Sequence, residues 1–314
     1  MPRTSRPRYG SLQFWPRKRA SRIVPRVNWE AIKTNEKGLK GFLGYKVGMM
    51  SAIVKDETPD SMTKGKKIAV PVTIIEVPEV KIYSVRFYKN KKVVGEVIVS
   101  NDKILKRKIK VPKKISNLED FKEDYDDIRI LVYPDLKKGF FKKTPELVEL
   151  ALEGTKEEKL NYVKEKIGKP IKVSEVFQDK IIDIRGVTKG KGIQGPVKRF
   201  GISLRQHKSE KGVRRPGNLG PWHPARVTFR TPMAGQTGFQ TRVIYNCIIL
   251  KKGNIKENDI NKKEGFHKYG LIKGDYLIVK GSVQGTQKRI VLLTKPLRPT
   301  KEKIKTKYEF LELT

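Results

Sequence analysis

Residues 184–242 constrain the fold of this chain more than any other stretch. They carry thirteen Lys or Arg against one acid, Glu210, together with ten Gly and five Pro. Gly and Pro at this density exclude a helix or strand of ordinary length from the middle of the stretch. So long a loop is uncommon in a compact domain unless it is functional or disordered, and its apolar content is too low to offset the entropy lost on ordering. The sequence therefore predicts that a polyanionic partner orders it.

The charge of the whole chain supports the same interpretation. Lys and Arg number 70 against 33 Asp and Glu, which gives a formal net charge of +37. Self-repulsion of this size destabilises a compact isolated protein, whereas neutralising phosphates releases condensed counterions. The chain is also 37% hydrophobic, enough for the core of one or two domains. We therefore expect a folded body with basic arms.

Several classes of protein are excluded at this stage. No apolar run reaches the roughly 18 residues that a membrane span needs, and the first ten residues, MPRTSRPRYG, contain no apolar signal region. The single cysteine, Cys247, excludes an internal disulfide framework and is expected to be a small buried apolar residue. Three widely spaced histidines give no metal-ligand spacing. We expect a cytoplasmic protein with no metal, no cofactor and no membrane partner.

Residues 1–28 form a second basic stretch. They contain eight Arg or Lys, four Pro and no acid, with aromatic residues interleaved. Arg planes and aromatic rings stack on unpaired bases while the charges follow phosphates, so the pattern favours an extended RNA-binding arm. A disordered basic tail is the alternative.

Runs of β-prone residues lie on both sides of the long basic stretch. The pattern at 41–54 predicts a strand, a tight bend and another strand, and 276–283 with 289–294 predict a hairpin-like pair. Alternating or β-branched patterns predict further strands. These lie at residues 68–78, 81–89, 93–100, 173–177, 181–188 and 239–253.

Residues 101–168 differ from their surroundings. Residues 144–154 (TPELVELALEG) have Pro at the first helical position, helical apolar spacing and Gly154 as a stop, which predicts a helix. Thr155 and Glu158 then match a capping box at the start of a second helix. Because the segment has no strong excess of positive charge, we expect an insertion that faces solvent or other proteins.

One motif suggests an enzyme. Residues 190–195 (GKGIQG) match the G-x-G-x-x-G pattern after a predicted strand. A dinucleotide site needs the third glycine to open a helix, with an acid about 20 residues on. Pro196 follows immediately, only Glu210 could serve as the acid, and the other kinase motifs are missing. The glycines are better explained by close approach of the backbone to phosphates.

Five segments together resemble the universal large-subunit ribosomal protein L-three family. They occur in the family's order along nearly the whole chain, and Trp222-His223, with a length below that of eukaryotic members, indicates the archaeal type. The segments are GSLQFWPRKRA (10–20), GFLGYKVGMM (41–50), RGVTKGKGIQGPVKRFGI (185–202), GPWHPARV (220–227) and MAGQTGFQTR (233–242).

The resemblance implies a fold that is mainly β with an α/β insertion: a translation-factor-type β-barrel core with long basic extensions. It also implies a loop that penetrates large-subunit rRNA toward the peptidyl-transferase centre, an arm that threads rRNA, and early entry into subunit assembly. The expected parts are a basic N-terminal arm at 1–40, a barrel core at 41–100, 169–188 and 239–300, a partly helical insertion at 101–168, the rRNA-penetrating loop at 189–238 and a C-terminal tail at 301–314.

The expected partners are large-subunit rRNA and neighbouring large-subunit ribosomal proteins, without a homo-oligomer. Cationic side chains of the arm and loop are expected to contact phosphates. These predicted rRNA-binding residues are Arg3, Arg6, Arg8, Arg17, Lys18, Arg19, Arg22, Lys189, Lys191, Lys198, Arg199, Arg205, His207, Lys208, Lys211, Arg214, Arg215, Arg226, Arg230 and Arg242. The predicted loop tip near the peptidyl-transferase centre is Gly220, Pro221, Trp222, His223 and Pro224.

Three alternatives remain open. Trp222 could be a core tryptophan rather than a stacking residue at the tip. An RNA-modifying enzyme would need a catalytic acid, nucleophile or cofactor pocket, and no such motif is found. A DNA-compacting protein fits the charge but fits poorly a long Gly/Pro loop centred on one Trp.

Overall fold

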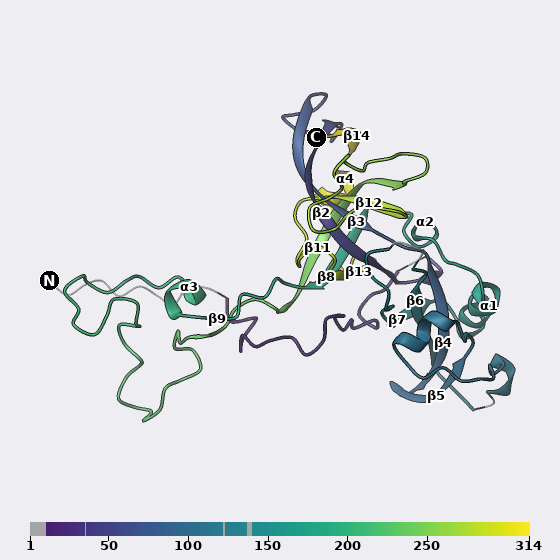
Figure 1. Cartoon of the computed structure of the whole chain (residues 1–314), viewed down its shortest axis with the longest axis horizontal. Helices are drawn as coiled ribbons and strands as arrows, with labels where there is room; N and C mark the ends of the chain where they lie inside the picture. The colour runs from purple at the N-terminus through teal and green to yellow at the C-terminus, as the bar shows by residue number, and fades with distance from the viewer. Residues whose placement is uncertain (1–10, 35, 122, 137–139) are drawn as a thin grey trace. The chain divides into compact units, whose positions relative to one another are not determined.

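The computed structural model describes residues 11–34, 36–121, 123–136 and 140–314 (Figure 1). The chain divides into two compact units. Unit 1 contains the described residues 11–22 and Thr188–Thr241, and unit 2 contains Ile23–Val187 and Arg242–Thr314. The long basic stretch and the N-terminal arm thus belong to one unit.

The larger sheet of unit 2 closes into a ring, as the predicted β-barrel requires. Closure leaves few free strand edges. At the strand pair that closes the ring, Leu292 lies opposite Leu43. The strands around the ring are β2 (Gly41–Asp56), β3 (Lys67–Glu76), β12 (Asp275–Lys280), β11 (Thr241–Asn254), β8 (Ile181–Val187) and β13 (Ile290–Thr294), which returns to β2. β14 (Tyr308–Leu313) extends the sheet along the second half of β2. The mainly β fold class is confirmed.

β2 is one strand of 16 residues, so the prediction of two strands joined by a tight bend is wrong. Its pairing with β3 is irregular between Lys46 and Gly48, which lets a long strand curve around the barrel. A Cβ at Gly44 would lie 2.7 Å from Cγ2 of Ile75, so this glycine marks close packing rather than a turn.

The second sheet of unit 2 is antiparallel and carries the helix α1 (Lys156–Lys166) beside it (Figure 1). Its strands, in order, are β1 (Gly38–Leu39), β7 (Val148–Glu153), β6 (Asp127–Pro134), β4 (Val80–Lys89) and β5 (Lys92–Ile98). β4 and β5 therefore lie outside the ring, although both fall within residues 41–100.

The predicted helix at 144–154 is wrong, because β7 occupies this stretch. A short apolar run fits both helical and strand spacing, and pairing with β6 decides the outcome. The capping box that follows is confirmed. The Thr155 N–H donates to Glu158 Oε2 at 3.0 Å, and the Glu158 N–H donates to Thr155 Oγ1 at 3.4 Å.

Two further predictions are corrected. Residues 173–177 form the helical turn α2 (Val173–Val176) rather than a strand, because Val173 and Val176 are buried at helical spacing. β12 and β13 do not form a hairpin. β12 pairs with β11 and β3, whereas β13 pairs with β8 and β2, because closing the ring places each strand between partners distant in sequence.

The remaining elements are short. Unit 2 has the 3-10 helices η1 (Lys103–Arg107) and η2 (Leu118–Asp120) and the helix α4 (Lys301–Lys305). Unit 1 has β9 (Ile193–Gln194), α3 (Pro196–Phe200) and β10 (Gly235–Gln236). Within the described residues, none of the helices is long and apolar enough to cross a membrane.

Both sheets of unit 2 contribute to one hydrophobic core, which includes Cys247, as predicted. A smaller cluster contains Tyr83, Leu105, Leu131 and Tyr133. The core is thus confined to unit 2 among the residues that the structure describes.

The turn between β2 and β3 is organised by a buried carboxylate, Asp56. Its oxygens accept hydrogen bonds from the Thr58 N–H at 2.9 Å, the Ser61 hydroxyl at 2.7 Å and the Thr63 hydroxyl. These bonds, with those from Thr58 largest, hold the pKa of the Asp56 carboxyl well below its usual value.

Candidate nucleic-acid interface

The glycine-rich start and end of the long basic stretch pair as an antiparallel stem. The Lys191 N–H donates to the Thr237 carbonyl and the Thr237 N–H to the Gly192 carbonyl, each at 2.9 Å, and β9 pairs with β10 just beyond. Gly238 has φ +70°, and a Cβ there would lie 2.1 Å from the Lys189 carbonyl oxygen. Only glycine fits this position without moving the backbone of the opposite leg.

The apparent nucleotide motif lies within this stem. Gly195 caps α3, and Pro196 occupies its first turn, so the inference that Pro196 prevents a helix is wrong. Proline is favoured at the first helical position because no intrahelical N–H bond is needed there. α3 is only five residues long and ends at Gly201, whose φ is +68°. With the two-residue strand β9 before it, α3 does not build the strand–turn–helix unit of a dinucleotide site.

The N-terminal arm packs against the stem within unit 1. The Ala20 N–H donates to the Phe239 carbonyl at 2.8 Å. Two arginines exchange hydrogen bonds: Arg17 Nη1 donates to the Arg199 carbonyl at 2.5 Å, and Arg199 Nη2 donates to the Arg17 carbonyl at 3.1 Å. The arm therefore forms a third segment of the stem.

Arg199 also crosses between the two legs. Its Nε donates to the Gln236 carbonyl at 3.2 Å and its Nη1 to the Met233 carbonyl at 2.9 Å. Desolvation by burial, and then the positive charge of Arg17, lower the pKa of its guanidinium. Arg199 thus bonds to carbonyls on both the arm and the return leg.

Aromatic rings complete this junction. Trp15 stacks on Phe200 with centroids 5.2 Å apart, and its edge meets Phe229 at 6.2 Å. The Arg17 guanidinium lies 4.3 Å from the Phe200 ring centroid. Arg17 and Arg199, predicted as phosphate ligands, therefore hold the arm and loop together. The sequence predicts phosphate contacts for both arginines and not this structural role. Its one signal was an aromatic residue close to each of them, Trp15 near Arg17 and Phe200 beside Arg199.

The other predicted rRNA-binding residues are mostly exposed. Arg205 is half-buried, and its N–H donates to the Val213 carbonyl at 2.9 Å within the loop. Arg242 is half-buried at the start of β11, and Arg3, Arg6 and Arg8 lie outside the described residues. Those exposed are Lys18, Arg19, Arg22, Lys189, Lys191, Lys198, His207, Lys208, Lys211, Arg214, Arg215, Arg226 and Arg230.

All five residues of the predicted tip, 220–224, are exposed. Trp222 is 87% exposed, so the alternative of a core tryptophan is wrong. The Gly220 N–H donates to Asn218 Oδ1 at 2.9 Å, and the Thr231 hydroxyl donates to the Leu219 carbonyl at 3.1 Å. The loop's own hydrogen bonds thus shape the tip while the indole stays accessible.

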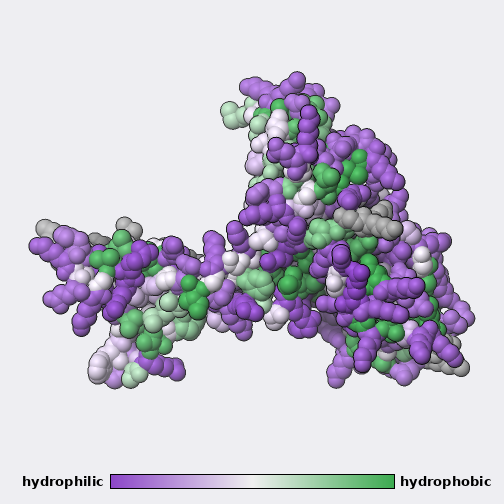
Figure 2. Space-filling model, viewed as in Figure 1, coloured by the Kyte–Doolittle hydropathy of each residue, from purple (hydrophilic) through white to green (hydrophobic). Residues whose placement is uncertain are grey.

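No described residue of unit 1 is buried. The unit nevertheless exposes large apolar side chains, among them Ile193 at 78% and Phe229 at 66%. Figure 2 shows hydrophobic patches among hydrophilic residues on the part of the chain that carries α3 and β9. Its described residues include fifteen Lys or Arg and one acid, Glu210. Unit 1 therefore presents cations and apolar surface together, a combination that suits RNA phosphates and bases.

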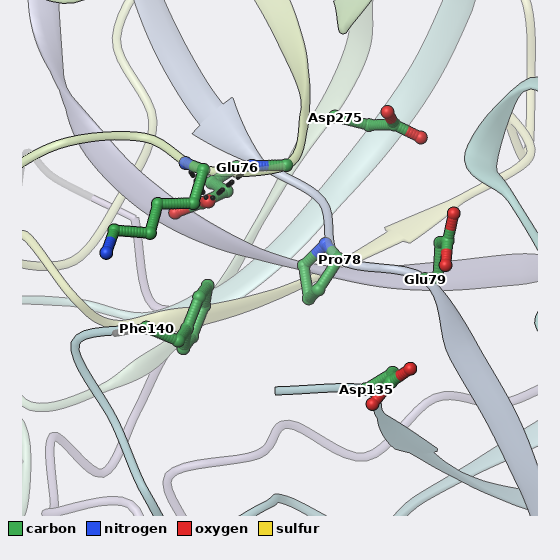
Figure 3. Close-up of a pocket in the computed structure, with 8 residues that line it drawn as sticks. Glu76, Pro78, Glu79, Asp135, Phe140 and Asp275 are labelled. Atoms are coloured by element: carbon green, nitrogen blue, oxygen red, sulfur yellow. Dashed lines mark hydrogen bonds between the residues drawn. The ribbon is translucent and has the colours of Figure 1, made fainter. Parts of the chain in front are cut away.

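Unit 2 contains a small pocket lined by acidic and apolar side chains (Figure 3). Glu76 lies at its edge, and its carboxylate accepts hydrogen bonds from the Tyr269 hydroxyl and from the Lys273 and Gly274 N–H groups at 2.9 and 3.1 Å. Burial raises the pKa of this carboxyl. In the described part of the chain, no three His, Cys, Asp or Glu are grouped to hold a metal ion. The residues that line the pocket include no Ser, Thr, Cys or His.

Comparison with known proteins gives the family. The sequence matches the family Ribosomal protein L3 over residues 1–102 and 87–312. The chain belongs to this ribosomal protein family. Large ribosomal subunit protein uL3 of Methanocaldococcus jannaschii is 42% identical over 318 residues, which cover 96% of this chain and 94% of that protein. The protein of the same name from Archaeoglobus fulgidus is 42% identical over 311 residues, covering 94% and 93%. That of Methanococcus vannielii is 42% identical over 315 residues, covering 95% and 93%.

These relatives confirm the resemblance to the archaeal type of the family. The chain is a structural constituent of the large ribosomal subunit and not an enzyme. This class of function agrees with a site made of exposed cations, aromatics and glycines.

Proposed function

We propose that unit 1 is the main rRNA-binding element of this ribosomal protein. In the proposal, its tip at residues 220–224 reaches toward the peptidyl-transferase centre, and its binding supports early assembly of the large subunit in the cytoplasm. Unit 2 then serves as the folded body that contacts neighbouring large-subunit ribosomal proteins.

The absence of any buried side chain among the described residues of unit 1 carries this proposal. Ordering a backbone costs about 1–2 kcal/mol per residue, and beyond its hydrogen-bonded stem a unit without a core cannot offset this cost by burying its own apolar surface. A folded RNA supplies both missing contributions. Its phosphates pair with the exposed cations, and its bases and sugars cover the exposed apolar groups.

The role of Trp222 follows from its exposure. An indole that is 87% exposed on a glycine- and proline-shaped tip presents a flat apolar face. Stacking such a ring on a base contributes about 1–3 kcal/mol. Trp222 therefore supplies binding energy only when RNA is present.

Salt-dependent binding of the full chain to large-subunit rRNA tests the phosphate contacts. The variant with Lys189→Ala, Lys191→Ala and Lys198→Ala removes three exposed cations of the stem. Each lost phosphate contact lowers the slope of log affinity against log salt by roughly 0.7–0.9, so the slope should fall by about 2 to 3.

A charge-matched control removes three exposed lysines scattered over unit 2, with Lys92→Ala, Lys169→Ala and Lys256→Ala. The control should keep a slope close to that of the unchanged chain. Equal slopes for the stem variant and the control would show that the stem does not contact phosphates.

A further inference from the structure

A second basic surface lies on unit 2, apart from the long loop in sequence. Residues 103–114 (KILKRKIKVPKK) contain seven Lys or Arg and no acid. The first five residues form η1, and the stretch connects β5 to the strands of the second sheet. The seven cations are Lys103, Lys106, Arg107, Lys108, Lys110, Lys113 and Lys114, and all are exposed.

The apolar residues of the stretch face the opposite way. Leu105 is fully buried in the small cluster with Tyr83, Leu131 and Tyr133, and Ile104, Ile109 and Val111 pack against that cluster. The stretch is therefore a fixed surface layer, with cations on one side and an apolar anchor on the other.

Hydrogen bonds hold the first half of this layer. The Tyr133 hydroxyl donates to Asp102 Oδ2 at 2.5 Å, and the Leu105 N–H donates to the Asp102 carbonyl at 3.0 Å. Arg107 Nη1 donates to the Lys143 carbonyl at 3.3 Å. The backbone that carries these cations is therefore held in place before any partner binds, which lowers the entropy cost of binding.

The cations of this layer lack the acidic partners found elsewhere on the same sheet. Arg86 pairs with Glu96 at 2.9 Å, and Lys159 pairs with Asp127 at 2.6 Å. By contrast, none of the seven cations of residues 103–114 has a described carboxylate within salt-bridge distance. Seven like charges in twelve residues repel one another, so their concentration on one face favours an anionic partner.

From this layer, and resting on the proposed rRNA-binding function, we infer a second rRNA contact: residues 103–114 bind the phosphate backbone of a double-helical rRNA segment. Residues 101–116 contain no aromatic side chain, and six of the seven cations are lysines, so the surface is less suited to stacking on unpaired bases than the tip of unit 1. Duplex RNA is recognised mainly through shape and backbone contacts, which lysines and arginines provide. The expectation that the whole of residues 101–168 faces solvent or proteins therefore changes for this layer.

The test uses the full chain, large-subunit rRNA and a salt series. A variant with Lys103→Gln, Lys106→Gln and Lys110→Gln should lower the slope of log affinity against log salt by about 2 to 3, at roughly 0.9 per duplex phosphate contact. Because the three side chains are exposed, the melting temperature should stay unchanged.

Its control carries Lys92→Gln, Lys169→Gln and Lys256→Gln, which remove the same charge from scattered exposed sites. A slope equal to that of the control would overturn the proposal. The two proposed rRNA contacts are tested separately. If the layer variant has the slope of its control, the stem variant of unit 1 can still show its own fall in slope.

Directed cleavage supplies a second readout. Since Cys247 is buried, an iron chelate attached to a cysteine introduced by Lys113→Cys labels the layer selectively. Cleavage should fall on both strands of one rRNA helix. Cleavage confined to single-stranded rRNA, or absent, would overturn the assignment. Loss of a neighbouring ribosomal protein from reconstituted subunits of the triple variant, with an unchanged salt slope, would identify an acidic protein partner instead.

Discussion

Arg199 provides the sharpest test of how unit 1 is built. Sequence alone treats it as one more phosphate ligand beside Lys198, but the structure gives its guanidinium three carbonyl acceptors, on Gln236, Met233 and Arg17. Arg199→Ala removes all three bonds, whereas Lys198→Ala removes only an exposed charge. The two neighbours therefore form a matched pair of equal charge.

The magnitude follows from those bonds. A hydrogen bond from a charged donor contributes about 1.5–3 kcal/mol when buried and about 1 kcal/mol when partly exposed, as here. Three such bonds sum to about 3 kcal/mol, which raises the opening equilibrium of the stem roughly a hundredfold. Hydrogen exchange of the stem amides, followed by mass spectrometry on the free full-length chain, measures this opening directly.

The Lys191 and Thr237 N–H groups report the opening because each is bonded across the stem. Arg199→Ala should accelerate their exchange, and Lys198→Ala should leave it unchanged. Exchange rates that are the same in both variants would refute the structural role of Arg199 and return it to the set of phosphate ligands.

Three further predictions concern other parts of the chain. Gly238→Ala should disrupt the stem and expose it to proteolysis, because its Cβ meets a carbonyl oxygen at 2.1 Å, whereas Gly217→Ala, with open space around it, should be tolerated; equal proteolysis would contradict the packing. Asp56→Asn should lower the free energy of unfolding by about 1–3 kcal/mol at neutral pH. Because its pKa is depressed in the folded state, this stabilisation is complete above the unfolded pKa and is lost as pH falls, so denaturant melts of the two proteins should converge in acid. Trp222→Ala should change the unfolding free energy of the free chain by less than about 0.5 kcal/mol while altering chemical protection of rRNA in reconstituted large subunits; a large fall in stability would contradict the exposed tip.

The sequence predicts well those elements whose signal is local. The β-branched run of β11 and the capping box at Thr155 depend on residues close in the chain, and both are found. β7 was predicted as a helix because six apolar-rich residues fit either period until β6 is beside them. The order of strands in the ring, and hence the absence of a β12–β13 hairpin, depends on closure between distant segments.

In the candidate site, too, some features are predicted from the sequence and others depend on contacts between distant segments. Composition and glycine content predict a long basic loop, and the structure shows a unit without buried residues in its described part, with Trp222 exposed at the tip. The distinct roles of Lys198 and Arg199 are not readable from sequence, because the partners of Arg199 are distant in the chain, and one of them, Arg17, lies 182 positions away. The layer at residues 103–114 was missed for another reason. The prediction considered the net charge of residues 101–168 as a whole, and only the structure shows the basic run exposed above a buried apolar anchor.

The closed ring determines how insertions and deletions in the long loop affect the stability of the barrel. β8 and β11 are neighbours in the ring, so residues 188–240 leave and re-enter the body across a single strand spacing of about 4.8 Å. The entropy of closing a loop between fixed ends rises only slowly with its length, by about 0.6 kcal/mol for each doubling. Insertions and deletions within the loop therefore leave the barrel's stability almost unchanged. The length of the loop can therefore vary while the body keeps its fold.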